Sequence, residues 1–288
     1  MNMVAEIIDG KEIAREIEEN IKSEVEKLKK KYEAKPCLSV ILVGKNPASK
    51  IYVRKKEEAC GRVGIEFKKI ELPESEEEEE IIKIIKKLNS DSNVNGVLVQ
   101  LPLPKHIDTK KVIDAISPYK DVDGLTKENM GNLILGDEKI SPCTPLGIIK
   151  MLEKIGISVE GKDVTIVNHS NIVGRPLAAM LLNRGATPTV CHKKTRNLKK
   201  HTLEADIVVT ATGVPRLIKE DMIKDGAIVI DGGIKKIGEK IVGDVDFEAV
   251  RKKASYITPV PGGVGPMTVS MVLFNLVQLF KAQLSKHI

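Results

Sequence analysis

The stretch Gly96–Pro104, which reads GVLVQLPLP, decides how this chain folds. Val97–Val99 is a short, wholly apolar run, which is typical of a strand buried on both faces of a parallel sheet. Pro102 and Pro104 end that strand, because proline has no N–H to donate to a neighbouring strand. Gln100 stands where the strand ends, and ligands in open α/β sheets bind just beyond the carboxyl ends of strands. Gln100 is therefore either a ligand-binding residue or a solvated strand end.

Strand and helix patterns alternate on both sides of this stretch. Before it, they predict a helix over 11–32 capped by Asp9, a strand over 38–43, a helix capped by Ser49 that runs to 63, a strand over 66–72 and a helix over 81–88. After it, they predict a short helix over 109–116, a turn over 121–124 and a helix over 146–155. Such repeated strand–helix units predict an α/β fold with a parallel sheet.

A second α/β unit begins at Gly161. Its predicted strands cover 164–167, 187–191, 206–210, 227–230 and 255–258, and a helix covers 173–182. This rhythm indicates a Rossmann-like parallel sheet. After a Pro- and Gly-rich loop, Pro266 is expected at the first position of an apolar last helix, which needs a partner surface. We therefore predict two domains, a discontinuous one over 1–145 plus 267–288 and a second one over 146–266.

The composition is typical of a globular protein with room for two domains. Of the 288 residues, 42% are hydrophobic and 30% are charged. No apolar run reaches the roughly 18 residues of a membrane span, no signal-peptide core begins the chain, and the histidines lack metal-ligand spacing. We therefore expect no membrane association and no metal. The cysteines are scattered, which indicates reduced thiols in the cytoplasm; they are Cys37, Cys60, Cys143 and Cys191.

The net charge of +6 suits an anionic partner, so nucleic acid must be considered. However, Lys and Glu are interleaved over 16–31, which indicates solvated helix faces with i,i+4 pairs. Four Tyr, four Phe and no Trp leave few aromatic rings on which bases could stack. We therefore expect no nucleic-acid binding.

Tyr52 and Lys56 are four residues apart, so they share one face of the predicted helix. A phenol and an amine that face a ligand could bind an aromatic substrate and move protons. Arg54 and Lys55 stand beside them, so the alternative is a solvated basic face. A catalytic Lys56 would need its pKa lowered by burial or by neighbouring positive charge.

Asp121-Val122-Asp123-Gly124 resembles the start of a calcium loop, but the later oxygen donors and the closing Glu are missing, so we exclude calcium. One interpretation of these two carboxylates is that they cap or close a turn. The other is that a carboxylate accepts hydrogen bonds from an amino-heterocycle.

Asn168–Pro176 occupies the strand-to-helix turn that carries the phosphate loop in dinucleotide-binding folds. Only Gly174 remains of a G-x-G-x-x-G pattern, so the match to that pattern is weak. Asn168 is expected in the left-handed conformation, which asparagine tolerates better than other non-glycine residues. Ser170 and the backbone amides of the turn would then offer donors to a phosphate.

The end of the following predicted strand favours NADP over NAD. Sites specific for NAD place an acid about 20 residues after the phosphate loop to hold the ribose hydroxyls. Here Cys191-His192 is followed by Lys193, Lys194 and Arg196, with no acid. These cations would attract the 2′-phosphate of NADP. The alternative is a solvated basic loop.

Eight motifs follow one another in order over almost the whole chain. They are Ser49-x-x-Tyr52-Val53-x-x-Lys56, the stretch Gly96–Pro104, Asp121–Gly124, Asn129-x-Gly131-x-Leu133, Pro142–Pro145, Ser170-x-x-Val173-Gly174-x-Pro176, Gly243–Phe247 and Pro259–Thr268. Together they resemble the bifunctional methylenetetrahydrofolate dehydrogenase/methenyltetrahydrofolate cyclohydrolase family. The resemblance implies a cleft between a folate-binding domain and a Rossmann-like NADP-binding domain.

The resemblance also implies roles for individual residues. Lys56 would be the acid/base group of the cyclohydrolase step, with Gln100 as its hydrogen-bonded partner and Asp123 holding the pterin. The other substrate-binding residues would be Tyr52, Pro261, Gly262, Gly263 and Val264. The cofactor-binding residues would be Thr144, Asn168, His169, Ser170, Val173, Lys193, Lys194, Thr195, Gly213 and Ile234.

The implied reactions are oxidation of 5,10-methylenetetrahydrofolate with NADP and hydrolysis of the product to 10-formyltetrahydrofolate, in one-carbon metabolism. The expected partners are tetrahydrofolate substrates and a second copy of the chain. Two positions depart from the family pattern: Asn168 replaces a usual Gly, and Glu58 replaces a frequent second Lys. The alternatives are another two-domain NADP dehydrogenase, acting on shikimate-like or amino-acid substrates, and a basic nucleic-acid or regulatory binding protein.

Overall fold

The computed structural model describes residues 4–285 and divides into two compact units. The six-stranded unit comprises the chain up to Ala14 and Thr144–Thr268, and the three-stranded unit comprises Arg15–Cys143 and the chain from Val269. The prediction placed residues 1–14 in the other domain. In the structure, residues 4–14 belong to the six-stranded unit, because β1 (Glu6–Ile7) pairs in parallel with β11 (Tyr256–Ile257).

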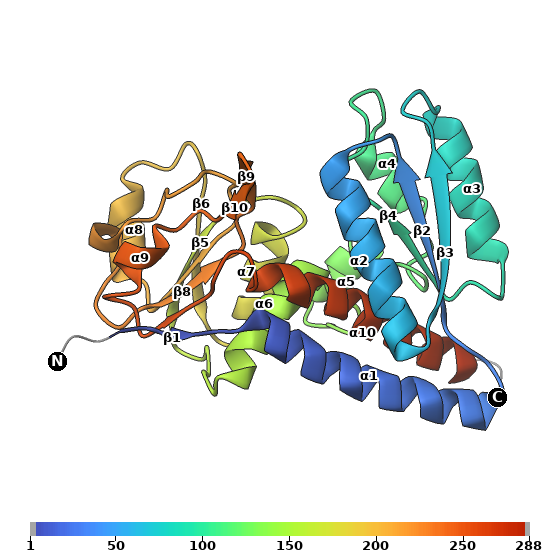
Figure 1. The fold of residues 1–288 in the computed structure, drawn as a ribbon, viewed down its shortest axis with the longest axis horizontal. Coiled ribbons are helices and arrows are strands. Elements are labelled where there is room, and N and C mark those ends of the chain that lie inside the picture. Colours follow the sequence, from blue (N-terminus) through green and yellow to red (C-terminus); the bar gives the residue numbers. More distant parts are fainter. Residues whose placement is uncertain (1–3, 286–288) are drawn as a thin grey trace. The chain divides into compact units, whose positions relative to one another are not determined.

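The sheet of the three-stranded unit contains Gly96–Val99, the first part of the stretch GVLVQLPLP. Its order is β3-β2-β4, formed by β2 (Cys37–Val43), β3 (Glu66–Leu72) and β4 (Gly96–Val99), and all pairs are parallel (Figure 1). Every residue of β2 and β4 is buried. The prediction of a short apolar strand buried on both faces is therefore confirmed.

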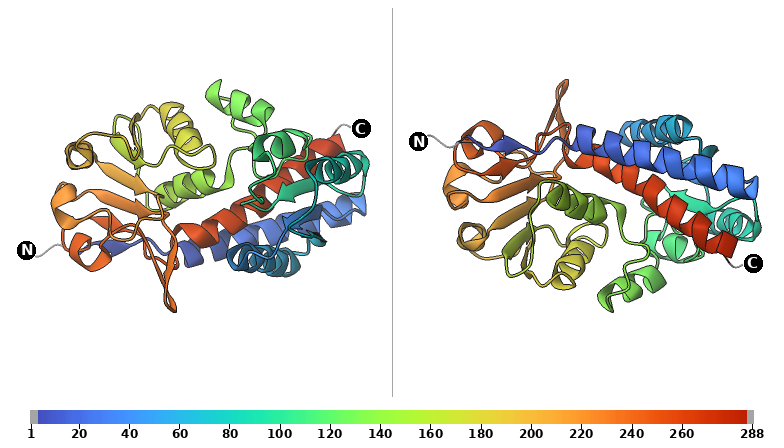
Figure 2. Two further views of the ribbon diagram at one scale, coloured as in Figure 1. Left: turned by 90° about the horizontal axis from the view of Figure 1, so that it is seen from above. Right: turned by 90° about the horizontal axis from the view of Figure 1, so that it is seen from below.

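The helices of this unit cover the sheet and set its apolar core. They are α1 (Gly10–Tyr32), α2 (Pro47–Val63), α3 (Glu78–Ser90), α4 (Thr109–Asp114), α5 (Lys127–Ile134) and, from Val269 on, α10 (Val264–Ser285). Residues of α3 and α4 share one core cluster with β2 and β4. Helices α1 and α10 run side by side (Figure 2), where Ser270 Oγ lies 3.2 Å from Glu18 Oε1 and Lys281 Nζ lies 3.0 Å from Glu24 Oε1.

Helix α2 begins earlier than predicted, because Asn46 and not Ser49 is its cap. Asn46 Oδ1 accepts hydrogen bonds from the N–H groups of Ala48 (2.9 Å) and Ser49 (3.2 Å), and Pro47 occupies the first turn. Ser49 is buried instead, with its hydroxyl 3.5 Å from the carbonyl oxygen of Leu101. The cap and the two turns that follow fix where the inward face of α2 points.

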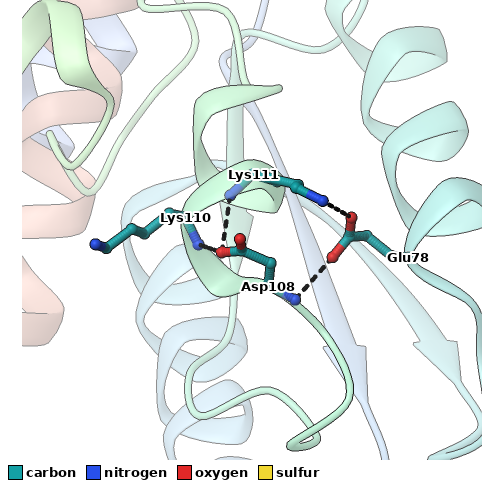
Figure 3. Close-up of polar contacts among 4 residues, drawn as sticks. All are labelled: Glu78, Asp108, Lys110 and Lys111. Atoms are coloured by element: carbon teal, nitrogen blue, oxygen red, sulfur yellow. Dashed lines mark hydrogen bonds and ion pairs between the residues drawn. The ribbon is translucent and has the colours of Figure 1, made fainter.

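A carboxylate in the first turn of α3 ties that helix to α4 (Figure 3). Glu78 accepts a hydrogen bond from the Asp108 N–H (2.7 Å) and pairs with Lys111 Nζ (3.2 Å). Asp108 in turn caps α4 through the N–H groups of Lys110 and Lys111. Glu78 therefore holds the loop that leaves β4.

The six-stranded sheet is wholly parallel and has the order β1-β11-β8-β7-β5-β6. Its further strands are β5 (Asp163–Val167), β6 (Thr187–Cys191), β7 (Ile207–Thr210) and β8 (Ile228–Asp231), and its helices include α6 (Cys143–Lys154), α7 (Gly174–Leu182), α8 (Leu198–Glu204) and α9 (Phe247–Val250). The predicted Rossmann-like α/β class is confirmed. The chain leaves β5 for β6 on one side and reaches β7 on the other, which makes the carboxyl ends of β5 and β7 a topological switch point.

A two-stranded antiparallel hairpin, β9 (Lys235–Ile237) with β10 (Lys240–Val242), was not predicted. The buried carboxylate of Asp231 holds its base. Asp231 accepts hydrogen bonds from the N–H groups of Gly233 and Val245, and burial raises its pKa to about 6.

Helix α10 begins at Val264, so Pro266 is not its first residue as predicted. By length and composition alone, α10 could cross a membrane. However, 67% of its most apolar window is buried inside the protein. Its apolar side chains therefore form core, as the sequence analysis expected from its need for a partner surface.

Candidate functional site

In the three-stranded unit, Lys56 of α2 points inward and contacts the end of β4. Its Nζ donates a hydrogen bond to Gln100 Oε1 at 2.9 Å, and the residue is only 5% exposed. Lys56 shares the buried face of the helix with Val53 and Cys60, whereas Lys55 is exposed. The interpretation of a solvated basic face is therefore wrong for Lys56.

Gln100 is held in place by three hydrogen bonds. Its backbone N–H donates to the carbonyl of Ile41 (2.9 Å), which extends the pairing of β4 with β2 by one step. Its side-chain nitrogen donates to the carbonyl of Leu101 (2.8 Å), which leaves the amide oxygen directed at Lys56. At 9% exposure Gln100 is not a solvated strand end, so that alternative is also wrong.

The two aspartates of the predicted turn have different environments. Asp121 is buried and forms an isolated parallel bridge with Val97, and its carboxylate accepts hydrogen bonds from the Thr126 N–H (2.8 Å) and from Asn129 Nδ2 (3.0 Å). It therefore closes the turn and anchors α5. Asp123 follows Asp121 by two residues and is half-buried. Because the bridge between Val97 and Asp121 is parallel, Asp123 lies toward the end of β4 that carries Gln100.

Burial perturbs the titration of both charged groups at this site. It lowers the pKa of Lys56, although the nearby carboxylate of Asp123 opposes that shift. It raises the pKa of Asp123, against the opposing effect of Lys56. Burial thus shifts Lys56 toward the neutral amine and Asp123 toward the protonated acid, while the charge of each group opposes the shift of the other.

Cys143 is a member of this site that the sequence analysis did not single out. Its thiol donates to the carbonyl of Val122 (3.3 Å) and lies beside the Asp123 carboxylate. Burial raises the pKa of this thiol well above its ordinary value, so it remains protonated. The only signal for it in the sequence is the motif Pro142–Pro145.

Tyr52 and Glu58 complete the description of α2. Tyr52 is half-buried, burial raises its pKa, and Lys55 Nζ lies 5.9 Å from the centre of its ring.

Glu58, which departs from the family pattern, pairs with Arg54 at 3.5 Å, and its side chain is 55% exposed. This substitution therefore places a carboxylate on the solvated side of the helix.

In the six-stranded unit, Asn168 organises the turn after β5. Its Oδ1 accepts hydrogen bonds from Ser170 N (2.8 Å), Ser170 Oγ (2.7 Å) and Gly174 N (3.0 Å). Its Nδ2 donates to the carbonyl of Ala211, at the end of β7 (2.6 Å). Asn168 therefore joins the two strands at the switch point of the sheet.

The expected left-handed backbone at Asn168 is wrong. The non-glycine residues with positive φ in the part of the chain that the structure describes are Glu33, Asn197 and Arg216. Asn168 acts instead through its side chain, which no glycine could do. A glycine is required at position 174, because the backbone there packs against that of Asn168. A Cβ on Gly174 would lie 2.0 Å from the Asn168 carbonyl oxygen.

The turn also satisfies most of its own donors. The N–H groups of Val173 and Arg175 donate to Ser170, at 3.2 Å to its hydroxyl and at 3.1 Å to its carbonyl. Together with the two N–H groups held by Asn168, four backbone donors are used within the turn. That amides of this turn bind a phosphate stays a prediction, and these four are engaged within the turn.

The loop after β6 presents the predicted cations. Lys193 and Lys194 are exposed, and the Thr195 hydroxyl accepts a hydrogen bond from the His192 N–H (2.9 Å). The ring of His192 meets that of His169 edge to face, with centroids 5.1 Å apart. The structure thus brings the loops after β5 and β6 together.

Other predicted residues of this unit lie in the loops around the sheet. Gly213 follows β7 in a loop that Asp244 anchors through Thr210 and Thr212. Ile234, at the start of the hairpin, is 46% exposed. Thr144 Oγ1 contacts Thr268 Oγ1 at 3.0 Å.

Pro261–Val264, predicted to bind substrate, also lies in the six-stranded unit. The Gly262 carbonyl accepts a hydrogen bond from the Lys11 N–H (3.1 Å). A Cβ on Gly10 would lie 1.9 Å from the Gly263 carbonyl oxygen, so the start of α1 packs tightly on this loop. The loop conformation therefore depends on the N-terminal segment.

Comparison with known proteins agrees with this arrangement. Family models match residues 8–123, as the tetrahydrofolate dehydrogenase/cyclohydrolase catalytic domain, and residues 142–284, as the NAD(P)-binding domain of the same family. A distant neighbour, shikimate dehydrogenase of Aquifex aeolicus, has a TM-score of 0.52 at 14% identity and shares the fold alone.

Much closer relatives cover nearly the entire chain. The bifunctional protein FolD of a Sulfurihydrogenibium strain is 54% identical over 96% of this chain and 98% of its own. The FolD structure of Campylobacter jejuni is 49% identical, with a TM-score of 0.95 over 96% of this chain and 99% of its own. The Trypanosoma brucei dehydrogenase-cyclohydrolase, solved with NADP and an inhibitor, is 38% identical, with a TM-score of 0.94 over 98% and 99%. The chain belongs to the tetrahydrofolate dehydrogenase/cyclohydrolase family.

Proposed function

We propose that this protein oxidises 5,10-methylenetetrahydrofolate with NADP and then hydrolyses the 5,10-methenyl product to 10-formyltetrahydrofolate in one-carbon metabolism. The observation that carries the proposal is the buried hydrogen bond between Lys56 Nζ and Gln100 Oε1. Family membership supports the pair of reactions, and the Trypanosoma brucei relative solved with NADP supports the cofactor.

Lys56 acts as the proton-transfer group of the hydrolysis. The methenyl carbon is amidinium-like and already electrophilic, so water needs only to lose a proton as its oxygen bonds to that carbon. A neutral Lys56 amine accepts that proton and returns it to the ring nitrogen as the carbon–nitrogen bond breaks. Burial, which lowers the pKa of Lys56, raises the fraction of neutral amine, and general acid–base catalysis of this kind contributes typically about 10²–10⁴-fold.

Gln100 and Asp123 orient the reactants. The amide oxygen of Gln100 fixes the position of Lys56 Nζ. Asp123 accepts hydrogen bonds from the amino and ring N–H groups of the pterin, while Tyr52 lies along the ring system. Charged carboxylate–donor pairs of this kind are stronger and more directional than neutral ones.

The six-stranded unit would hold NADP at the switch point of its sheet. When bound, NADP would supply the hydride acceptor for oxidation of the methylene carbon. The residues present fit this group: exposed lysines follow β6, and Gly174 brings backbone close to the end of β5. Since the amides of the turn after β5 are largely satisfied internally, the cations of the loop after β6 supply most of the attraction for the phosphates.

The protein works in the cytoplasm as a homodimer. The hairpin formed by β9 and β10 supports the dimer, because each strand pairs with the other and, within residues 4–285, neither pairs on its outer edge. Ile237 (55% exposed) and Ile241 (44% exposed) lie on this hairpin. An exposed strand edge that carries apolar side chains is a template for pairing with a second copy.

The first prediction concerns Lys56. In Lys56→Met, hydrolysis of methenyltetrahydrofolate should fall about 10²–10⁴-fold, because the proton-transfer group is lost, whereas oxidation of the methylene substrate with NADP should persist. The wild-type hydrolysis rate should rise with pH and level off below pH 10.5, the ordinary pKa of lysine, because burial lowers the pKa of Lys56. Absorbance assays of both reactions over a pH series, with uncatalysed hydrolysis subtracted, measure this.

Lys50→Met is the matched control, because Lys50 is exposed on the same helix. It should leave both rates unchanged. Normal hydrolysis in Lys56→Met would remove Lys56 from the mechanism, and a wild-type protein that turns over neither substrate would overturn the proposed function.

The second prediction concerns cofactor choice. The double change Lys193→Ala and Lys194→Ala should raise the Kd of NADP about tenfold or more, through the loss of charge-assisted contacts to the 2′-phosphate. The Kd of NAD should change much less, since NAD lacks that phosphate. Fluorescence titration with the reduced cofactors measures both constants. Lys199→Ala is the control, because Lys199 pairs with Asp221 at 2.6 Å, and equal weakening of both cofactors would contradict the assignment.

The third prediction concerns assembly. Multi-angle light scattering at micromolar concentration should give twice the 31.6 kDa mass of one chain. The double change Ile237→Glu and Ile241→Glu should give the monomer mass, because like charges would face each other across the hairpins. Ile134→Glu, at a 63% exposed position of the three-stranded unit, should remain dimeric. A wild-type monomer would refute the homodimer.

A further inference from the structure

Helix α10 carries one polar side chain in the middle of its apolar core segment. Asn275 is fully buried, and so are its neighbours Leu273, Leu276 and Val277. A buried amide in such a place costs free energy unless its groups are paired. Its contacts therefore indicate why an amide is present.

One nitrogen atom of Asn275 joins two distant segments of the three-stranded unit. Its Nδ2 donates to the carbonyl oxygens of Val122 (2.9 Å) and Ser141 (2.8 Å), and it lies 3.6 Å from Cys143 Sγ. Val122 directly precedes Asp123, and Ser141 directly precedes the Pro142–Pro145 motif. Asn275 thus holds the two segments that carry Asp123 and Cys143.

Close packing at two glycines shows that these segments have little room to move. A Cβ on Gly124 would lie 2.7 Å from the carbonyl carbon of Ser141. A Cβ on Gly96 would lie 2.3 Å from Val122 Cγ1 and 2.6 Å from Leu276 Cδ1. Val122 is therefore packed between β4 and α10, and the Asn275 bonds fix the direction of its carbonyl.

The orientation of the Asn275 amide follows from its partners. Carbonyl oxygens only accept hydrogen bonds, so the nitrogen must face Val122 and Ser141. The amide oxygen is buried and has no hydrogen-bond partner among the described residues. An apolar side chain at this position would bury no unpaired oxygen and would suit the core better. The amide is therefore best explained by the two hydrogen bonds that its nitrogen donates to Val122 and Ser141.

The Val122 carbonyl and the Asp123 N–H belong to one planar peptide group. Fixing the direction of that carbonyl therefore fixes the plane from which the Asp123 side chain departs. Cys143 Sγ donates to the same carbonyl at 3.3 Å, so two donors from different elements hold one peptide. In contrast, the neighbouring Asp121 is fixed by its own carboxylate, through Thr126 and Asn129.

We propose that Asn275 is a positioning residue that aims the Asp123 carboxylate at the folate substrate. The proposal rests on the proposed function, in which Asp123 binds the pterin. Asn275 acts through the peptide plane that precedes Asp123 and does not itself touch the substrate. Its removal should therefore weaken binding of folates while leaving NADP binding unchanged.

The experiment compares Asn275→Ala with wild type in both reactions. KM for methylene- and methenyltetrahydrofolate should rise about tenfold or more, because misplacement of a binding group by about 1 Å is costly. The Kd of NADP, from fluorescence titration, should stay within twofold. Asn275→Ser retains one donor and should give an intermediate KM, which keeps the test decisive if the alanine variant does not fold.

Gln283→Ala is the matched control on the same helix. Gln283 Nε2 also donates to two backbone carbonyls, those of Asn95 and Tyr119, each at 2.9 Å. Its loss should lower the Tm, as the loss of Asn275 should, but leave KM for both folates unchanged. If Gln283→Ala raised KM as much as Asn275→Ala, the effect would be general destabilisation and the proposal would fall.

A double-mutant cycle with Asp123→Asn tests whether Asn275 acts through Asp123. If it does, Asn275→Ala should raise KM in the wild type but not further in the Asp123→Asn background. The inference would be refuted if the fold-increases in KM of the two single variants multiplied in the double variant. It would also be refuted if Asn275→Ala left KM unchanged. Absence of folate turnover in the wild type would instead overturn the proposed function, so the two failures are distinguishable.

Discussion

The burial of the Lys56 amine is the constraint on which the three-stranded unit depends. A buried ammonium without a partner is costly, so the surrounding structure must either neutralise it or supply an acceptor. Here it does both: burial lowers the pKa, and the amide oxygen of Gln100 accepts the hydrogen bond. The strand end, the helix face and the Asp123 turn all serve this one arrangement, because each supplies a group that faces the amine.

The two units reach ordered sites by different means. In the six-stranded unit, Asn168 occupies a position where the family usually has glycine, and its side chain makes four hydrogen bonds. These bonds close the turn after β5 and connect it to the end of β7. Two backbone N–H groups of the turn, those of Ser170 and Gly174, are thereby held by Asn168. The exposed lysines of the loop after β6 add positive charge beside this turn, which suits NADP, because its 2′-phosphate makes it more negatively charged than NAD.

Much of the fold could be predicted, because local patterns determine it. The apolar run Val97–Val99, the period of α1 and the repeated strand–helix rhythm depend only on neighbours in the sequence. Lys56, Gln100 and Asp123 could be named from motifs, and the family resemblance implied the Lys56–Gln100 hydrogen bond. Their burial could not be predicted, since three separate segments create it. Asn46 and Ser49 are both good caps by residue type. Only the structure distinguishes them, because Asn46 accepts the capping hydrogen bonds and Ser49 is buried near Leu101.

The remaining features depend on contacts between residues far apart in the chain. The hairpin at 235–242 is largely exposed and charged, so it lacks the alternating pattern that identifies most strands. Asn275 lies more than 130 residues from its partners, and one polar residue in an apolar helix carries no local sign of what it holds.

The buried cysteines give the protein a set of internal reporters. Burial raises the pKa of all four thiols, to about 11 for Cys37 and about 12 for Cys60, so a thiol reagent meets little thiolate while the fold is intact. Each thiol becomes reactive only when its surroundings open. Three of them belong to the three-stranded unit and Cys191 belongs to the six-stranded unit. The alkylation rate of each cysteine therefore reports how often its own unit opens, independently of the other unit and without an introduced label.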